Sequence, residues 1–119
     1  MKPSFMGSAG ASKYSNKKVT IDGITFDSKK EAKVYGELKA LLSAGEIKSL
    51  DRQVNYTLIP SQRIDGKVIE KPVQYKADFV VHHNDGETAI IDAKGMRTPV
   101  YVIKRKLMLQ IHGIRIQEV

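Results

Sequence analysis

Three acidic residues and one lysine are the side chains of this sequence best suited to chemistry. Asp92 and Lys94 stand two positions apart, Asp78 precedes Asp92 with thirteen residues between them, and Glu31 lies in the first third of the chain. Carboxylates are the ligands that hard divalent cations prefer. The 119 residues include no cysteine, which excludes disulfides, thiolate metal sites and cysteine nucleophiles. The chemistry to expect is therefore that of an oxygen-ligated metal ion.

The pairing of two strands decides whether the aspartates meet. Residues 73–82 and 87–94 are rich in β-branched side chains and flank a short polar segment, which predicts a β-hairpin. A three-residue turn that ends at a left-handed Gly86 sets Asp78 directly opposite Asp92. Two like charges at that spacing repel each other unless a cation lies between them. The hairpin therefore predicts a site for Mg²⁺, with Mn²⁺ as a substitute, because both ions take carboxylate, water and phosphate oxygens.

Glu31 has two interpretations. Ser28 can cap a helix over residues 29–44, and a glutamate three residues after a serine cap is the usual capping box. At about 100° per residue, however, Glu31 lies on the same helix face as Tyr35 and Leu38, which must pack against other parts of the protein. We expect Glu31 either as a helix cap or as the third acid of the metal site.

Turn signals and hydrophobic periodicity predict the other elements. Asp22-Gly23 between two apolar segments is typical of a tight hairpin, and strict alternation of apolar and polar residues indicates a half-buried strand. The expected elements are a hairpin over residues 19–26, a strand over 50–59, a loop or hairpin excursion over 60–72 and a short strand over 114–119.

A second helix is expected to open at Pro99 and to stop at Gly113. Residues 1–18 contain few apolar side chains and are expected to form a flexible basic arm, while residues 19–119 form a single domain. The apolar face of the second helix is expected to consist of Val100, Ile103, Leu107 and Ile111.

The charge of the chain indicates a polyanionic partner. Twenty lysine and arginine residues against thirteen acids give a formal net charge of +7, and no acid lies between Lys94 and Gln117. Such a segment favours nucleic acid, while a solvated helix face has the same composition. No apolar run is long enough for a membrane span or a signal peptide, so we expect a cytoplasmic protein without a membrane partner. The side chains expected to bind DNA are Arg97, Thr98, Tyr101, Lys104, Arg105 and Lys106.

The segments around the two aspartates resemble the motif of a nuclease superfamily. Two segments together resemble the PD-(D/E)XK motif, and they are Tyr75-Lys76-Ala77-Asp78-Phe79 and Asp92-Ala93-Lys94-Gly95. Ala77 stands at the position of the motif proline. Together with Phe26-Asp27-Ser28-Lys29-Lys30-Glu31-Ala32, they are similar to small phage-encoded endonucleases described as Holliday-junction-resolvase-like. The resemblance extends from about residue 19 to the C-terminus.

This resemblance implies an α/β fold with a restriction-endonuclease-like core, which is a mixed central sheet in α-β-β-β-α-β order after an N-terminal β-hairpin. It implies a Mg²⁺-dependent endonuclease that hydrolyses DNA phosphodiester bonds, selective for branched or junction DNA in phage recombination or DNA processing. Glu31, Asp78 and Asp92 match the metal-binding acids of the superfamily. Lys94 matches the motif lysine, which orients the attacking water and helps to remove its proton.

Two other functions stay open at this point. The chain is alternatively a non-catalytic nucleic-acid-binding module with the same fold, or a nuclease subunit of a larger recombination or packaging complex. A homodimer is expected for a junction resolvase, because two strands must be cut symmetrically. Further candidate site residues are Gln53, which resembles a polar position on the preceding strand of some relatives, and Lys76.

Overall fold

The structure is a computed structural model that describes residues 18–93 and 96–119. The chain divides into two compact units, residues 1–37 and 38–119, and each is described by itself. The boundary falls within helix α1 (Lys29–Ser43). Of the predicted basic arm over residues 1–18, only Lys18 lies within the described residues.

The first unit contains the predicted hairpin. Strands β1 (Val19–Ile21) and β2 (Ile24–Phe26) pair antiparallel around Asp22-Gly23, whose φ angles are 54° and 76°. Two consecutive left-handed residues are what a two-residue type I′ turn requires. Tyr35 of α1 donates its hydroxyl hydrogen bond to Asp22 at 3.1 Å, and its ring packs against Phe26 with the centroids 4.9 Å apart. These contacts fix the hairpin against the first half of α1.

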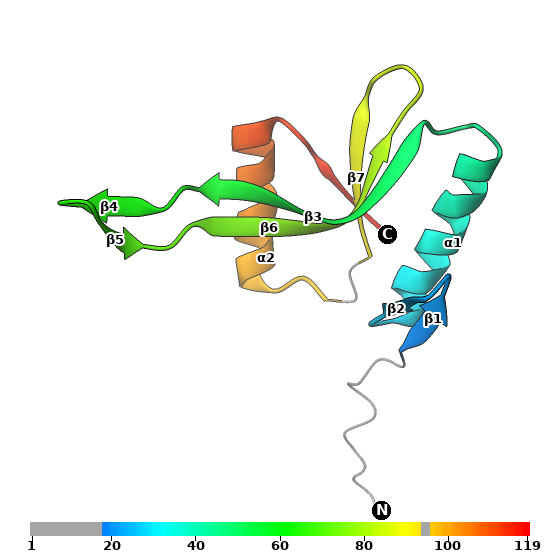
Figure 1. Ribbon diagram of the computed structural model, residues 1–119, viewed down its shortest axis with the longest axis horizontal. Coiled ribbons are helices and arrows are strands. Elements are labelled where there is room, and N and C mark those ends of the chain that lie inside the picture. The colour runs from blue at the N-terminus through cyan, green and yellow to red at the C-terminus, as the bar shows by residue number, and fades with distance from the viewer. Residues whose placement is uncertain (1–17, 94–95) are drawn as a thin grey trace, which may run out of the picture. The chain divides into compact units, whose positions relative to one another are not determined.

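The second unit is built on a four-stranded sheet with the order β3-β6-β7-β8 (Figure 1). β6 runs antiparallel to both β3 and β7, whereas β8 runs parallel to β7. A parallel neighbour needs a crossover connection, and here it is a helix that ends in a π-helical turn, η1. The elements are β3 (Ser49–Ile59), β6 (Val73–His82), β7 (Thr88–Asp92), α2 (Pro99–Leu107), η1 (Met108–His112) and β8 (Ile116–Glu118).

A two-stranded ribbon joins β3 to β6, and Figure 1 shows it continuing the direction of these long strands beyond the sheet. It consists of β4 (Gln62–Ile64) and β5 (Lys67–Glu70), and all its residues are exposed. Asp65 and Gly66 form its left-handed turn, with φ angles of 51° and 79°. Of the two possibilities predicted for this segment, the hairpin excursion is therefore the observed one.

One apolar cluster fills the space between the sheet and α2. On β3 the predicted alternation is confirmed, because Leu58 is buried and Val54 and Tyr56 pack against the cluster, while Asn55 and Thr57 are exposed. The buried members of the cluster are Leu58, Tyr75, Ala77, Val80, Ile90, Tyr101, Met108 and Ile116.

The buried side of α2 differs from the predicted one. Tyr101 and Met108 are buried, whereas Val100, Ile103 and Ile111 of the expected apolar face are exposed. The physical reason is that Met108 fills the core and the Tyr101 hydroxyl finds a carboxylate partner there, so the helix turns this side to the sheet. Of the four residues in the predicted stripe, Leu107 packs against the core cluster, and the prediction was wrong for the other three.

The fold is mixed α/β, as predicted, with a strand-rich mixed sheet and two helices. The restriction-endonuclease-like core stays a prediction. Among the described residues, no helix is both long and apolar enough to cross a membrane.

We predict that Met108→Ala lowers the free energy of unfolding by about 2–5 kcal/mol, because Met108 is fully buried and its truncation leaves a cavity. The neighbouring Leu109 is 54% exposed, so Leu109→Ala should change that free energy by no more than about 0.5 kcal/mol. Urea unfolding of both variants tests the orientation of the helix. Equal losses in the two variants would contradict it.

Candidate functional site

The β6–β7 turn has the predicted geometry. The His83 amide donates to the Glu87 carbonyl at 2.8 Å, the Gly86 amide donates to the His83 carbonyl at 3.1 Å, and Gly86 is left-handed with φ 93°. Four cross-strand pairs follow in one register and end at Phe79 opposite Ile91. Asp78 and Asp92 are the next positions in this register. The prediction of a three-residue turn and its register is confirmed.

Each aspartate is oriented by a specific hydrogen bond. Asp92 is fully buried, and its Oδ2 accepts a bond from the Tyr75 hydroxyl at 2.5 Å. Asp78 is half-buried, and its Oδ2 accepts a bond from the Ala93 amide at 3.0 Å. Asp78 therefore reaches across to the end of β7, where Asp92 stands.

Tyr75 lies within the electric field of both carboxylates. Its burial and its bond to Asp92 raise the pKa of Tyr75 above the ordinary value, and the negative charge of Asp78 raises it further. The direct contact is with Asp92, whose Oδ2 accepts the hydroxyl bond, while Asp78 acts on the hydroxyl through its charge alone. The Tyr75 hydroxyl is thus a neutral donor that satisfies a buried carboxylate, as burial of a charge requires.

The backbone of β3 is irregular at the level of Asp78. The β3–β6 ladder keeps one register across this level, with Arg52 opposite Phe79 and Val54 opposite Ala77. Gln53 has φ 54°, a left-handed conformation that costs a non-glycine residue about 1–2 kcal/mol.

The side-chain alternation of β6 is shifted at the same level. Ala77 and Val80 are three residues apart and yet belong to the same core cluster. On a regular strand, residues three apart point to opposite faces. Backbone strain of this kind concentrates at functional sites. The irregularity therefore marks the level of Asp78 and Gln53 as a candidate site, independently of the motif.

A second carboxylate, that of Glu118, lies on β8 beside Asp92 and is surrounded by hydrogen-bond donors. Glu118 pairs with Asp92 in the parallel ladder and has a side chain only 15% exposed. Its Oε2 accepts bonds from the Tyr101 hydroxyl at 2.6 Å and from Arg105 at 3.2 Å, and its Oε1 accepts one from Arg97 at 2.5 Å. The Tyr101 bond and the two arginines hold the pKa of Glu118 at about 2. Sequence reasoning missed Glu118, since a lone acid near a chain end carries no motif.

A family model described as a protein of unknown function (DUF1064) matches residues 11–117. The chain belongs to the DUF1064 family. No curated protein and no solved structure matches it.

The remaining candidate residues of this DUF1064 chain fall into separate places. Lys94 lies outside the described residues, so its role as the motif lysine stays a prediction. Glu31 belongs to the first unit, where its backbone amide donates to the Ser28 hydroxyl at 3.1 Å. Ser28 is thus the predicted helix cap, and Glu31 is buried on the same side of α1 as Tyr35. Membership of Glu31 in a metal site stays a prediction.

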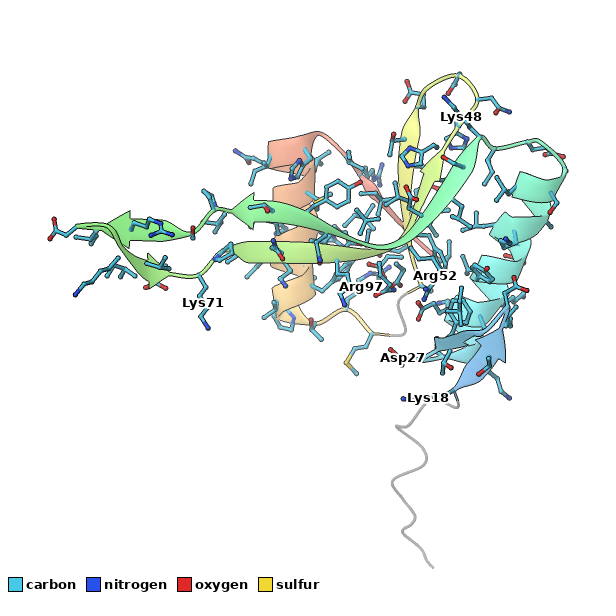
Figure 2. All side chains as sticks on the ribbon, viewed as in Figure 1. Lys18, Asp27, Lys48, Arg52, Lys71 and Arg97 are labelled. Carbon is cyan, nitrogen blue, oxygen red and sulfur yellow. The ribbon has the colours of Figure 1, made fainter. Side chains whose placement is uncertain are left out.

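The candidate DNA-binding residues divide by what their side chains contact. Thr98 caps α2 by accepting from the Tyr101 amide at 3.1 Å, and Arg97, labelled in Figure 2, bonds to Glu118. Lys76 of β6 and Lys104 of α2 line one hollow together with Thr98 and Tyr101. Lys106 is exposed on α2, and Arg105 bonds to Glu118 from the side of β8. The basic side chains therefore flank α2.

The donor set suits a hard divalent cation. Mg²⁺ is commonly held by one or two carboxylates, with water and substrate phosphate oxygens in the other positions. Asp78 and Asp92 supply two carboxylates at one strand end, and Asp78 is accessible from solvent. Within residues 18–93 and 96–119, no three His, Asp or Glu side chains are grouped as metal ligands. The chemistry of the two aspartates thus fits Mg²⁺ or Mn²⁺.

We predict that Gln53→Gly leaves the free energy of unfolding unchanged or raises it by up to about 1 kcal/mol. Glycine adopts φ 54° without the steric cost that glutamine pays, although it loses more backbone entropy on folding. Gln53→Ala is the matched control, because it removes the amide and keeps the strain. Urea unfolding of both variants tests the strain. A loss above about 1 kcal/mol in Gln53→Gly alone would contradict it.

We predict that the stabilisation supplied by Tyr75 disappears in alkali. The folded pKa of Tyr75 is raised above the unfolded value of about 10, so its contribution is complete below pH 10 and is lost as the pH rises through the folded pKa. Tyr75→Phe should therefore cost about 1.5–3 kcal/mol at about pH 8 and less at about pH 11. Urea unfolding of both proteins across this range measures the difference. A difference that does not change with pH would refute the assignment.

Proposed function

We propose that this DUF1064 protein is a metal-dependent DNA endonuclease that hydrolyses phosphodiester bonds and is selective for branched or junction DNA. The observation that carries the proposal is the meeting of Asp78 and Asp92 at one strand end, on a chain with a formal net charge of +7. The motif resemblance supplies the reaction class and the preference for branched substrates.

Asp78 and Asp92 would hold the metal ion, with Glu31 as a third acid in the motif interpretation. When bound, the ion would polarise the scissile phosphate and lower the pKa of a water molecule that it holds. Mg²⁺ fits this role, and Mn²⁺ substitutes for it because it takes the same oxygen ligands.

The protein's own groups prepare this site. The Tyr75 hydroxyl fixes the Asp92 carboxylate, and the Ala93 amide fixes the Asp78 carboxylate, so neither has to be ordered when the substrate arrives. Lys94, as the motif lysine, would orient the attacking water and, as a neutral amine, would accept its proton. The ammonium group formed in this way would stabilise the extra negative charge that develops on the phosphate oxygens.

The basic side chains beside α2 hold the DNA backbone. Lys76 and Lys104 lie on one side of the helix and Lys106 on the other, where they neutralise phosphates. Contacts to phosphates position the duplex without reading its sequence. Weak sequence preference is what an enzyme selective for DNA shape requires.

We predict that Asp78→Asn and Asp92→Asn each reduce cleavage by more than about 100-fold, because each removes a metal-ligand charge and keeps the side-chain shape. The substrates are four-way junction, flap, nicked and linear DNA, each incubated with Mg²⁺, Mn²⁺ or EDTA. The matched control is Asp85→Asn in the β6–β7 turn, where asparagine can still accept the bond from the Glu87 amide. This control should retain full activity.

Two outcomes would overturn the proposal. Cleavage that persists in EDTA would exclude the metal mechanism. DNA binding without cleavage under any metal condition would identify the chain as the non-catalytic binding module. Circular dichroism of each asparagine variant shows whether a loss of activity comes from a loss of fold.

A further inference from the structure

The outward side of α2 and η1 carries a row of exposed aliphatic side chains. Val100, Ile103 and Ile111 are 61%, 58% and 47% exposed. At about 100° per residue, Ile103 lies about 160° around the helix from the buried Tyr101, and Val100 and Ile111 lie between Ile103 and the buried side. We call these three residues the outer row. Single exposed aliphatic side chains are common on proteins, so the meaning of the outer row depends on the charges that surround it.

A hollow of about 260 Å³ lies on the β6 side of α2. Its two cations come from different elements, Lys76 from β6 and Lys104 from α2. No acidic side chain is among its lining residues, which are Tyr75, Lys76, Thr98, Val100, Tyr101 and Lys104. An anion in this hollow would contact both ammonium groups.

A second hollow, of about 390 Å³, lies on the β8 side of α2 and η1. Arg105, Lys106 and Arg115 supply three cations to it, and Glu118, its one acid, is already bonded to Arg97 and Arg105. In the sheet, β7 lies between β6 and β8. The two cationic hollows therefore flank α2 on opposite sides, with Ile103 on the exposed surface between them and Val100 at the border of the first hollow.

We propose that α2 and η1 enter the major groove of duplex DNA, with the outer row against the base edges and each hollow against one phosphate strand. This inference rests on the proposed function, in which DNA is the substrate, and adds how the duplex is held. An α-helix with its side chains is about 10–12 Å across, and the major groove is about 12 Å wide. A helix seated there has a phosphate strand on each flank.

The outer row suits base edges rather than a particular sequence. Aliphatic side chains contact the thymine methyl group and the carbon edges of bases, and they offer no hydrogen bonds that would select one base pair. Such a surface gives affinity with little sequence readout. This matches an enzyme that selects DNA by its shape.

The charges around the outer row favour DNA over a second copy of this chain. In a symmetric dimer the same patch meets itself, so Lys104 and Lys106 beside the row would face their own counterparts. Between Lys94 and Gln117 there is no acid to compensate for them. Duplex DNA instead supplies negative charge on both flanks of the helix.

The salt dependence of DNA binding tests the two hollows. Binding of a fluorescent linear duplex is measured in EDTA by anisotropy across a salt series, which keeps binding separate from cleavage. Each phosphate contact contributes about 0.9 to the slope of log K against log salt. Two double variants each remove two cations from one hollow. We expect each of them to reduce the slope by about 1.8, and they are Lys76→Gln with Lys104→Gln and Lys106→Gln with Arg115→Gln.

The matched control removes the same charge away from α2. Lys48 lies near the β6–β7 turn, as Figure 2 shows, and Lys67 lies on the ribbon, so neither lines either of the two hollows beside α2. Lys48→Gln with Lys67→Gln should leave the slope unchanged. The proposal would be overturned if the slope fell in only one of the two double variants, or if it fell by the same amount in the control variant.

The outer row is tested by Ile103→Ser. We expect duplex affinity to fall about tenfold with the salt slope and the thermal unfolding midpoint unchanged, because Ile103 is exposed. Methyl green, which occupies the major groove, should displace the protein, whereas the minor-groove ligand netropsin should not. Unchanged affinity in Ile103→Ser, or displacement by netropsin alone, would refute groove entry. Unchanged affinity with a dimer reduced to a monomer in light scattering would assign the row to self-association.

The outcomes also separate this inference from the nuclease proposal. If the double variants lower the salt slope but the protein shows no metal-dependent cleavage, groove binding is retained and the endonuclease is rejected. Metal-dependent cleavage with unaltered slopes would retain the endonuclease and reject groove binding by α2.

Discussion

A carboxylate removed from water needs a donor, and in this chain the Tyr75 hydroxyl supplies one to Asp92. The Tyr101 hydroxyl does the same for Glu118 on the neighbouring strand. The two tyrosine rings lie with their centroids 6.5 Å apart, so both bonds belong to one buried region. Together they join β6 to β7 and α2 to β8. The orientation of α2, the burial of Asp92 and the position of the basic side chains all depend on these two pairs.

The same two pairs explain which predictions from the sequence could succeed. The register of β6 and β7 is a local property, because Gly86 alone permits the left-handed turn that fixes it. The orientation of α2 is not local. Apolar spacing selected Val100 and Ile103, but a hydroxyl bond to a carboxylate on a distant strand turned Tyr101 inward. A pattern that counts only apolar residues cannot include that bond.

The candidate site shows a similar division. Asp78 and Asp92 were found from strand parity and the motif, and the register that brings them together is observed. The left-handed conformation of Gln53 has no sequence signal, because glycine or asparagine would be the usual residue there. Tyr75 and Glu118 were missed as partners, since a tyrosine in a strand and an acid near a chain end are ordinary residues. Their roles arise only when four elements pack together.

The parallel strand β8 has a consequence for the time at which the site forms during synthesis. β7 emerges from the ribosome before β8, and until residues 116–118 follow, the edge of β7 that carries Asp92 has no neighbour. Domains fold as units, so the sheet is completed only when β8 is available. The amide of Val119 then bonds to the Asp92 carbonyl at 3.0 Å and closes this edge. A nascent chain that ends before β8 therefore carries both aspartates and lacks the strand that pairs with the edge of β7 at Asp92.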